Sequence, residues 1–156
     1  MALHIVLVEP EIPPNTGNIA RTCAATGTVL HLVQPLGFSL DDRQLARAGL
    51  DYWPFVELIL HDDLDAFLSS WSGKRMFLAT THSTRRHTDV QYRDGDALVF
   101  GKETKGLPDW LIEERSQDTV RIPMSSCAQL RSLNVSNAAA VILYEALRQT
   151  GFPGLK

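Results

Sequence analysis

The stretch HIVLVEPEIPPNTGNIARTCAATGTVLHLV, residues 4–33, contains one complete strand–helix–strand unit. Its two ends, HIVLV (4–8) and VLHLV (29–33), are continuous apolar runs without alternation, which is typical of strands buried on both faces. Between them, NIARTCAAT (18–26) predicts a helix that ends at Gly27. Such a unit predicts two parallel strands joined by a helix.

The same alternation continues to the end of the chain. Asp41 or Asp42 suits the N-terminus of the next helix, and Pro108 suits the first turn of a later one. Further strands are predicted at 56–60, 75–81, 97–101 and 119–123, and further helices at 40–50, 62–71, 108–116 and 135–149. We therefore predict a single α/β domain over 1–156, with a mostly parallel sheet flanked by helices.

The composition fits this class. The chain has 156 residues, of which 44% are hydrophobic and 21% charged, with a formal net charge of −3. Because no run approaches about 18 apolar residues and the N-terminus lacks signal-peptide features, we expect no membrane segment and a cytoplasmic location. Cys23 and Cys127 are too few for a disulfide framework or a metal site, and both suit buried apolar positions.

Ligands of open parallel sheets bind beyond the carboxyl ends of the strands. Four loops follow predicted strands there: EPEIPPNTGN (9–18), HSTRRH (82–87), GKETKGLP (101–108) and PMSSCAQLRSLN (123–134). They are rich in Gly, Asn, Ser, Arg and Pro, so the loop chemistry and the sheet geometry predict the same site. The negative net charge argues against a strong nucleic-acid binder, although STRRH (83–87) is a local basic cluster.

The first loop lacks the glycine-rich dinucleotide and phosphate-loop patterns. It has instead NTGNIAR (15–21), which leads into a helix whose free amides attract anions. Arg21 could add a charged fork toward a phosphate. Equally, Asn15 or Asn18 could cap the helix while Arg21 is solvated.

Two later loops hold the other candidates. Gly101 at a strand end would allow a ligand to approach the backbone, and Glu103 beyond it is either a catalytic or a surface carboxylate. In RSLNVSNA (131–138), Ser132 or Asn134 could cap the final helix. Ser136 and Asn137 then fall in the first helical turn, where short polar side chains lower helix propensity. This favours a binding site there.

Three segments together resemble the signature motifs of the SPOUT superfamily of RNA methyltransferases: NTGNIAR (15–21), LVFGKETKGLP (98–108), and RIPM with RSLNVSNAAAVILYEALRQ (121–149). EPEIPPNTGNIAR (9–21), RAGLDY (47–52) and GFPG (151–154) look closest to the TrmL/YibK branch, which comprises minimal single-domain tRNA 2′-O-methyltransferases. The resemblance covers essentially the whole chain.

This resemblance implies a fold, a cofactor and a substrate. The fold would be a parallel α/β sheet with a deep C-terminal trefoil knot, and the working unit a homodimer with the first and last helices at its interface. The cofactor would be S-adenosylmethionine. The substrate would be the ribose of the wobble nucleotide (position 34, cytidine or a modified uridine) in the anticodon loop of leucine tRNAs. The residues implied at the cofactor are Leu78, Ala79, Thr80, Gly101, Glu103, Ile122, Met124, Ser132 and Leu133.

The resemblance also implies roles for polar residues. The catalytic set would be Arg21, Asn15, Glu103, Ser132 and Asn134, with RNA contacts from Arg21, Arg85, Arg86, Arg131 and Tyr144. A guanidinium is a very poor base, so we interpret Arg21 as a phosphate anchor and leave the base open. Tyr144 suits a core or dimer-interface position as well as an RNA contact.

Three alternatives remain open. The same chemistry could act on ribosomal RNA, or the chain could be a non-catalytic RNA-binding or assembly factor with this fold. A flavodoxin-like nucleotide-binding domain fits the strand pattern but leaves RSLNVSNA (131–138) unexplained.

Overall fold

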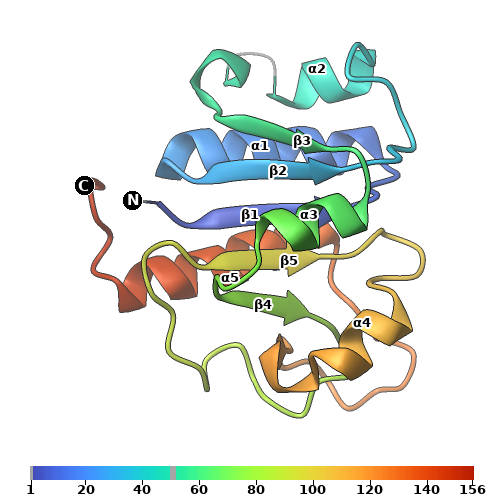
Figure 1. Cartoon of the computed structure of the whole chain (residues 1–156), viewed down its shortest axis with the longest axis vertical. Coiled ribbons are helices and arrows are strands. Elements are labelled where there is room, and N and C mark those ends of the chain that lie inside the picture. The colour runs from blue at the N-terminus through green and yellow to red at the C-terminus, as the bar shows by residue number, and fades with distance from the viewer. Residues whose placement is uncertain (1, 50–51) are drawn as a thin grey trace.

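A computed structural model describes residues 2–49 and 52–156 of the chain. Its centre is a six-stranded sheet with the order β3-β2-β1-β5-β4-β6, in which every pair of neighbouring strands is parallel (Figure 1). The strands are β1 (His4–Val8), β2 (Val29–Val33), β3 (Leu58–His61), β4 (Met76–Ala79), β5 (Ala97–Phe100) and β6 (Thr119–Val120). The predicted parallel α/β architecture is confirmed.

Helices cover both faces of this sheet. In Figure 1, α1 and α5 lie behind the strands, and α3 lies in front of them with α4 below it. Their bounds are α1 (Pro13–Thr26), α2 (Arg43–Gly49), α3 (Leu64–Ser70), α4 (Asp109–Glu114) and α5 (Val135–Gln149), with 3-10 turns η1 (Trp53–Phe55) and η2 (Ser116–Asp118). No helix in the described part of the chain is long and apolar enough to cross a membrane.

The core lies in two layers, one on each side of the sheet. Ile5 and Leu7 of β1 pack into the layer under α1 and α5, whereas Val6 and Val8 pack into the layer under α3 and α4. Because successive strand residues point to opposite faces, a strand covered on both sides needs an apolar residue at every position. This explains the continuous apolar runs of the sequence.

The first helix begins earlier than predicted. It starts at Pro13, five residues before the predicted start, with prolines in the first turn, where a missing N–H costs no helical hydrogen bond. Asn15 is therefore inside the helix and buried, and no side chain of the N-cap residue Ile12 caps it. The alternative that Asn15 or Asn18 caps this helix is wrong.

Other helix ends agree better with the sequence. The carboxylate of Asp42 accepts a hydrogen bond from the backbone N–H of Gln44 at 2.7 Å. Asp42 rather than Asp41 therefore caps the N-terminus of α2. The helix predicted for 40–50 is shorter in the structure, and its last position, Leu50, lies outside the described residues. Cys23 is fully buried as expected, and burial raises the pKa of its thiol to about 12, but Cys127 is exposed.

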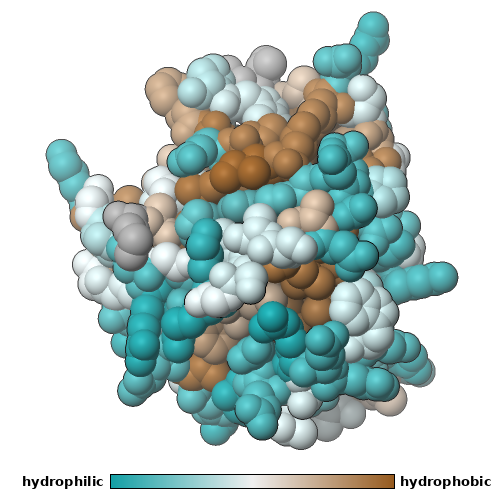
Figure 2. All heavy atoms as spheres, in the orientation of Figure 1, coloured by the Kyte–Doolittle hydropathy of each residue, from teal (hydrophilic) through white to brown (hydrophobic). Residues whose placement is uncertain are grey.

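The surface differs in polarity from one region to another. Figure 2 shows mostly hydrophilic atoms, with an apolar area over the end of the sheet where β3 lies. Leu60 of β3 is 44% exposed and Phe55 of the preceding 3-10 turn is 76% exposed. The sheet edge formed by β3 is thus the apolar side of the molecule in this view.

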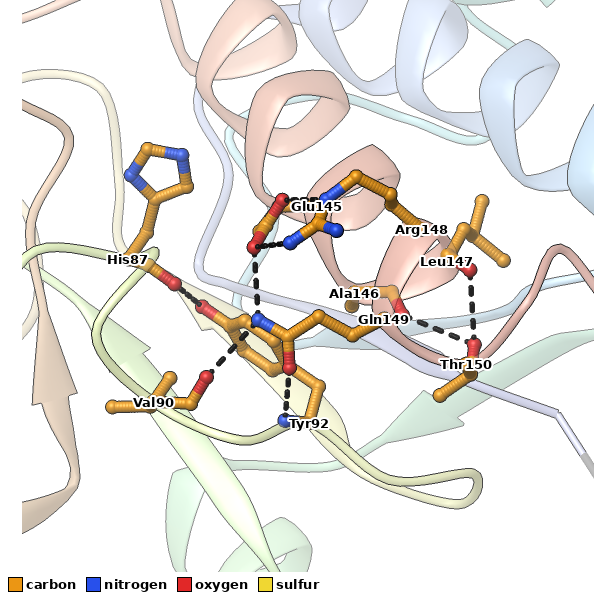
Figure 3. A network of polar contacts seen from close by, with 9 residues as sticks. All are labelled: His87, Val90, Tyr92, Glu145, Ala146, Leu147, Arg148, Gln149 and Thr150. Atoms are coloured by element: carbon orange, nitrogen blue, oxygen red, sulfur yellow. Dashed lines mark hydrogen bonds and ion pairs between the residues drawn. The ribbon is translucent and has the colours of Figure 1, made fainter.

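Gln149, the last residue of α5, fastens the β4–β5 loop to that helix (Figure 3). Its amide oxygen accepts the N–H of Tyr92 at 2.9 Å, and its amide nitrogen donates to the carbonyl of Val90 at 3.0 Å and to Glu145 at 2.8 Å. The hydrogen bonds from Arg148 and Gln149 lower the pKa of Glu145 to about 2. These side chains hold the loop at the amino edge of the sheet.

Candidate functional site

A cavity of about 550 Å³ lies beyond the carboxyl ends of the strands. This volume is in the range of pockets for small molecules and cofactors. The loops after β1, β4, β5 and β6 and the start of α5 form it together. Of the residues predicted for the site it is lined by Asn15, Ala79, Thr80, Gly101, Glu103, Ile122, Met124, Arg131, Ser132, Leu133 and Asn134.

The structure places the other predicted residues away from this cavity. Leu78 is fully buried in the core under α3 and α4, because it points to the opposite face of the sheet from Phe77 and Ala79. Arg85 donates to the backbone carbonyls of Gln117 and Thr119, and Arg86 pairs with Asp89 at 3.4 Å.

Arg21 and Tyr144 also lie outside the cavity lining, on helices. Arg21 is exposed on α1, six residues beyond Asn15, which corresponds to about 9 Å along the helix axis. Tyr144 on α5 is 48% exposed. Their predicted roles in RNA contact stay predictions.

Asn15 and Asn134 connect the starts of two helices at the cavity. The amide nitrogen of Asn134 donates to the amide oxygen of Asn15 at 3.0 Å. The amide oxygen of Asn134 accepts from the N–H of Ser136 at 2.9 Å and from its hydroxyl at 2.5 Å. Asn134, rather than Ser132, is therefore the cap of α5. Ser136 is explained by this local contact, and Asn137 has no such account.

Glu103 holds the start of α1. One carboxylate oxygen accepts the N–H of Glu11 at 2.8 Å, and the other accepts the N–H of Ile12 at 3.3 Å. The carboxylate thus supplies from a distant loop the cap that the helix lacks locally, at the end where a negative charge is favourable.

The side chain of Glu11 in turn bonds to the loop that carries Glu103. Its carboxylate accepts from the N–H of Thr104 at 3.1 Å and from the hydroxyl of the same residue at 2.7 Å. These bonds lower the pKa of Glu11. The two loops therefore hold each other in place beside the start of α1, the helix that carries Asn15.

Gly101 is required by the chain's own backbone. A Cβ atom there would lie 2.1 Å from the carbonyl carbon of Gly106 and 2.2 Å from the nitrogen of Leu107. The turn between them is closed by a hydrogen bond from the N–H of Gly106 to the carbonyl of Lys102 at 2.8 Å. Close approach of the backbone at Gly106 and Leu107 accounts for this glycine. The approach of a ligand to Gly101 stays a prediction.

Cationic side chains line the cavity beside its apolar walls. Sequence reasoning named only Arg131 among them, and it missed Lys102, Lys105, Arg121 and the neighbouring His82. Each follows a strand, and that placement was the available signal. Arg131 donates to the carbonyl of Ala128 at 2.9 Å, and Lys102 lies 3.8 Å from Glu9. Glu103 and Asp109 are the acidic lining residues.

The parallel α/β sheet, the cavity that loops build at its carboxyl edge, and the three ordered motifs all fit the class of RNA methyltransferases that the sequence resembles. The chain matches the model of the SpoU rRNA Methylase family over residues 2–144 and belongs to that family. The resemblance predicted from the motifs is thereby confirmed.

Two relatives match the chain over nearly its full length. It is 51% identical to the tRNA (cytidine(34)-2′-O)-methyltransferase of Escherichia coli (strain K12), over 97% of this chain and 96% of the relative. It is 52% identical to the enzyme of the same name from Methylovorus glucosotrophus (strain SIP3-4), over 96% of this chain and 97% of the relative.

Solved structures show the same likeness. One that gives structural insights into the 2-OH methylation of C/U34 on tRNA superposes with a TM-score of 0.90, at 47% identity and 95% coverage of both chains. The SpoU methyltransferase AviRb from Streptomyces viridochromogenes, in complex with AdoMet, gives a TM-score of 0.83 at 26% identity, over 95% of this chain and 57% of that one.

Proposed function

We propose that this protein acts in the cytoplasm and transfers the methyl group of S-adenosylmethionine to the ribose 2′-hydroxyl of nucleotide 34, cytidine or a modified uridine, in leucine tRNAs. The observation that carries the proposal is the match, over 95% of both chains, to a structure of 2-OH methylation at C/U34 of tRNA. The relatives that bear the corresponding name support it.

The cavity suits the cofactor. Ala79, Ile122 and Leu133 offer apolar walls for an adenine, and Thr80 and Ser132 offer hydroxyls within the same lining. S-adenosylmethionine has no phosphate, so the site needs no glycine-rich phosphate loop. When bound, the cofactor supplies an electrophilic methyl group on its sulfonium sulfur, and the contribution of the protein is chiefly positioning.

The cationic lining supports an RNA substrate. S-adenosylmethionine carries a sulfonium and an ammonium against one carboxylate, so it is itself a cation at neutral pH. The cavity lining has four cationic residues, which is more than the single carboxylate of the cofactor needs: Lys102, Lys105, Arg121 and Arg131. They suit the phosphates of a nucleic acid, whose binding is largely electrostatic.

The residues divide into two kinds of role. Asn15, Asn134 and Ser132 line the cavity, where they would orient the cofactor or the reacting hydroxyl, and Glu103 keeps Asn15 in place through α1. Arg21 would anchor a phosphate of the target nucleotide. The base that takes the hydroxyl proton is left open.

We propose a homodimer through α1 and α5 as the working unit. These two helices lie side by side behind the sheet (Figure 1). Val141 and Tyr144 of α5 are exposed. Arg21 lies outside the cavity lining of its own chain. A second chain packed on α1 would bring additional cations toward each site.

We also propose that the chain contains the SPOUT-type trefoil knot. Its support is the backbone pairing of the β4–β5 loop with the segment after β6. The N–H of Arg121 donates to the carbonyl of Arg85 at 2.8 Å, and the N–H of His87 donates to the carbonyl of Arg121 at 2.7 Å.

Methylation of ribosomal RNA is the second candidate, since the matching family model carries that description. The test incubates the protein and labelled S-adenosylmethionine with tRNA and ribosomal RNA from a strain that lacks the activity, followed by mapping of 2′-O-methyl groups. Label at nucleotide 34 of leucine tRNAs is expected. Label in ribosomal RNA alone would establish the second candidate, and failure to bind the cofactor would favour a non-catalytic assembly factor.

A further inference from the structure

The guanidinium of Arg21 lies over the ring of Tyr52, with its central carbon 4.6 Å from the ring centroid. This is within the distance at which a cation is attracted to an aromatic face. Arg21 is exposed, and no carboxylate of the described residues forms an ion pair with it. The aromatic ring is thus the contact that defines where this charge lies.

The backbone that carries Tyr52 is fixed. The N–H of Phe55 donates to the Tyr52 carbonyl at 2.9 Å, which closes the η1 turn. Trp53, the first residue of that turn, and Val56, which follows it, pack against the core under α1 and α5. The ring is half-buried and stands on an anchored turn, whereas the arginine side chain is long and exposed. Contact with the ring therefore restricts Arg21 more than it restricts Tyr52.

We infer that Tyr52 is a positioning residue for Arg21, which it holds ready for a phosphodiester of the RNA. The inference rests on the proposed function, because it takes Arg21 as the phosphate anchor. A guanidinium that stacks on a ring uses its face and leaves the N–H donors at its edge available. A carboxylate partner would instead occupy those donors and cancel the charge. The contact with the Tyr52 ring therefore restricts the guanidinium and leaves its N–H donors available.

The inference also gives a reason for one sequence string that the cavity leaves unexplained. Tyr52 is the last residue of RAGLDY (47–52), and the cavity lining includes none of the residues of this string that the structure describes. Its Leu50 and Asp51 lie outside the described residues. Arg47 in the same string is exposed on α2, which packs against α1. The string thus adds an aromatic ring in contact with Arg21 and a second exposed cation on the neighbouring helix.

The test compares Tyr52→Leu, which removes the aromatic face, with Tyr52→Phe, which keeps it. For methylation of tRNA, Tyr52→Leu should raise KM roughly fivefold with kcat within about twofold, whereas Tyr52→Phe should stay within about twofold in both. The dissociation constant of S-adenosylmethionine should not change. Phe55→Leu, on the same turn but 76% exposed, is the matched control for disturbance of η1 and should behave as the parent protein.

A double-mutant cycle on tRNA affinity makes the inference falsifiable without reference to turnover. Arg21→Ala should weaken tRNA binding, and adding Tyr52→Leu to it should cause no further loss. A Tyr52→Leu protein with unchanged KM, additive losses in the cycle, or Arg21→Ala with unchanged affinity would each overturn the inference. Absence of methylation at nucleotide 34 would overturn the proposed function alone, because the binding cycle is measured independently.

Discussion

The two edges of the sheet use polar side chains in different ways. At the amino edge, Asp96 and Gln149 direct their polar atoms to backbone groups and side chains of the chain itself. At the carboxyl edge, Asn15, Asn134 and Glu103 make internal bonds as well, but they also line a cavity of about 550 Å³. The cavity, rather than the presence of polar side chains, therefore distinguishes the functional site from a purely structural set of hydrogen bonds.

This difference has a measurable consequence. Substitutions at the carboxyl edge should act mainly on kcat/KM for methyl transfer and only secondarily on the free energy of unfolding. Substitutions at the amino edge should do the reverse, because the groups there contact only the protein.

Gly101→Ala should have the largest effect. Its Cβ would meet the backbone of Gly106 at 2.1 Å, so the turn over 102–106, which lines the cavity, must move. A displacement of this order can cost about 100-fold in rate, and we expect kcat/KM to fall by about that factor. Steady-state methylation and titration with S-adenosylmethionine measure the effect.

Gly27→Ala is the control for that change. Gly27 has φ +68° but has nothing within 4 Å of a Cβ, so the substitution should cost about 1 kcal/mol of stability and leave activity intact. Gly101→Ala with parental turnover would show that the turn does not shape the site, and would remove the contrast between the two edges.

Asp96→Ala should have the next largest effect, and on stability instead. The Asp96 side chain is 2% exposed and accepts from the Arg75 side chain at 2.8 Å and from the N–H of Arg93 at 2.7 Å. Its loss leaves these donors unpaired, which should lower the free energy of unfolding by about 2 kcal/mol. Urea unfolding measures this, and kcat/KM of the folded protein should stay within about twofold.

Asp118→Ala is the matched control, since the Asp118 carboxylate pairs with Arg115 at 3.4 Å and is 43% exposed. Such a surface pair contributes little, so stability should change by less than about 0.5 kcal/mol. If Asp96→Ala reduced turnover as strongly as Gly101→Ala, the amino edge would be part of the functional site.

The sheet was predictable because burial on both faces favours apolar residues along the whole strand, as in His4–Val8 and Val29–Val33, where one histidine each is the exception. The start of α1 was not predictable from local rules. Its cap is Glu103, which is 91 residues away in sequence from Ile12. A pattern of neighbouring residues contains no information about such a contact, so the sequence predicts a later start for the helix and places Asn15 in a loop.

The site was predictable to the extent that its residues belong to loops after strands. Gly101, Ser132 and Asn134 follow that rule and line the cavity. Arg21 is placed by helix geometry instead, and its contact with Tyr52 joins segments that the sequence analysis treated separately. Arg121 was missed because the strand predicted at 119–123 includes it, whereas β6 ends at Val120 and leaves Arg121 in the loop that follows.

Three hydrogen-bonded histidines between the sheet and α3 contact only the protein itself, so their effect on stability can be tested by changing the pH. His31 joins its ring nitrogens to those of His4 and His61, each at 2.9 Å. Burial, followed by repulsion from His4, His61 and Lys74, lowers the pKa of His31 to about 3. In the unfolded chain a histidine takes up its proton near pH 6.5, whereas folded His31 stays neutral until about pH 3.

The stability contributed by neutral His31 is therefore complete above about pH 6.5 and is lost as pH falls toward 3. We expect the free energy of unfolding to be about 1 kcal/mol lower at pH 5.5 than at pH 7.5, measured by urea unfolding. His31→Leu should remove most of this dependence, and His82→Leu, at the exposed cavity rim, should retain it. An unchanged pH dependence in His31→Leu would assign the effect to other groups.

Lys105→Ala and Arg121→Ala should have the smallest effects and test what the cavity rim binds. Each should raise KM for tRNA about threefold and reduce by about one the slope of log affinity against log salt concentration. Lys74→Ala is the control, because Lys74 lies over the Trp71 ring, away from the cavity lining, and should leave that slope unchanged. Affinity for S-adenosylmethionine should not weaken, since removing a cation does not disfavour a cationic ligand. Weaker cofactor binding with an unchanged salt slope would instead place these side chains on the carboxylate of the cofactor, and the cations at the carboxyl edge would then serve the small molecule rather than the RNA.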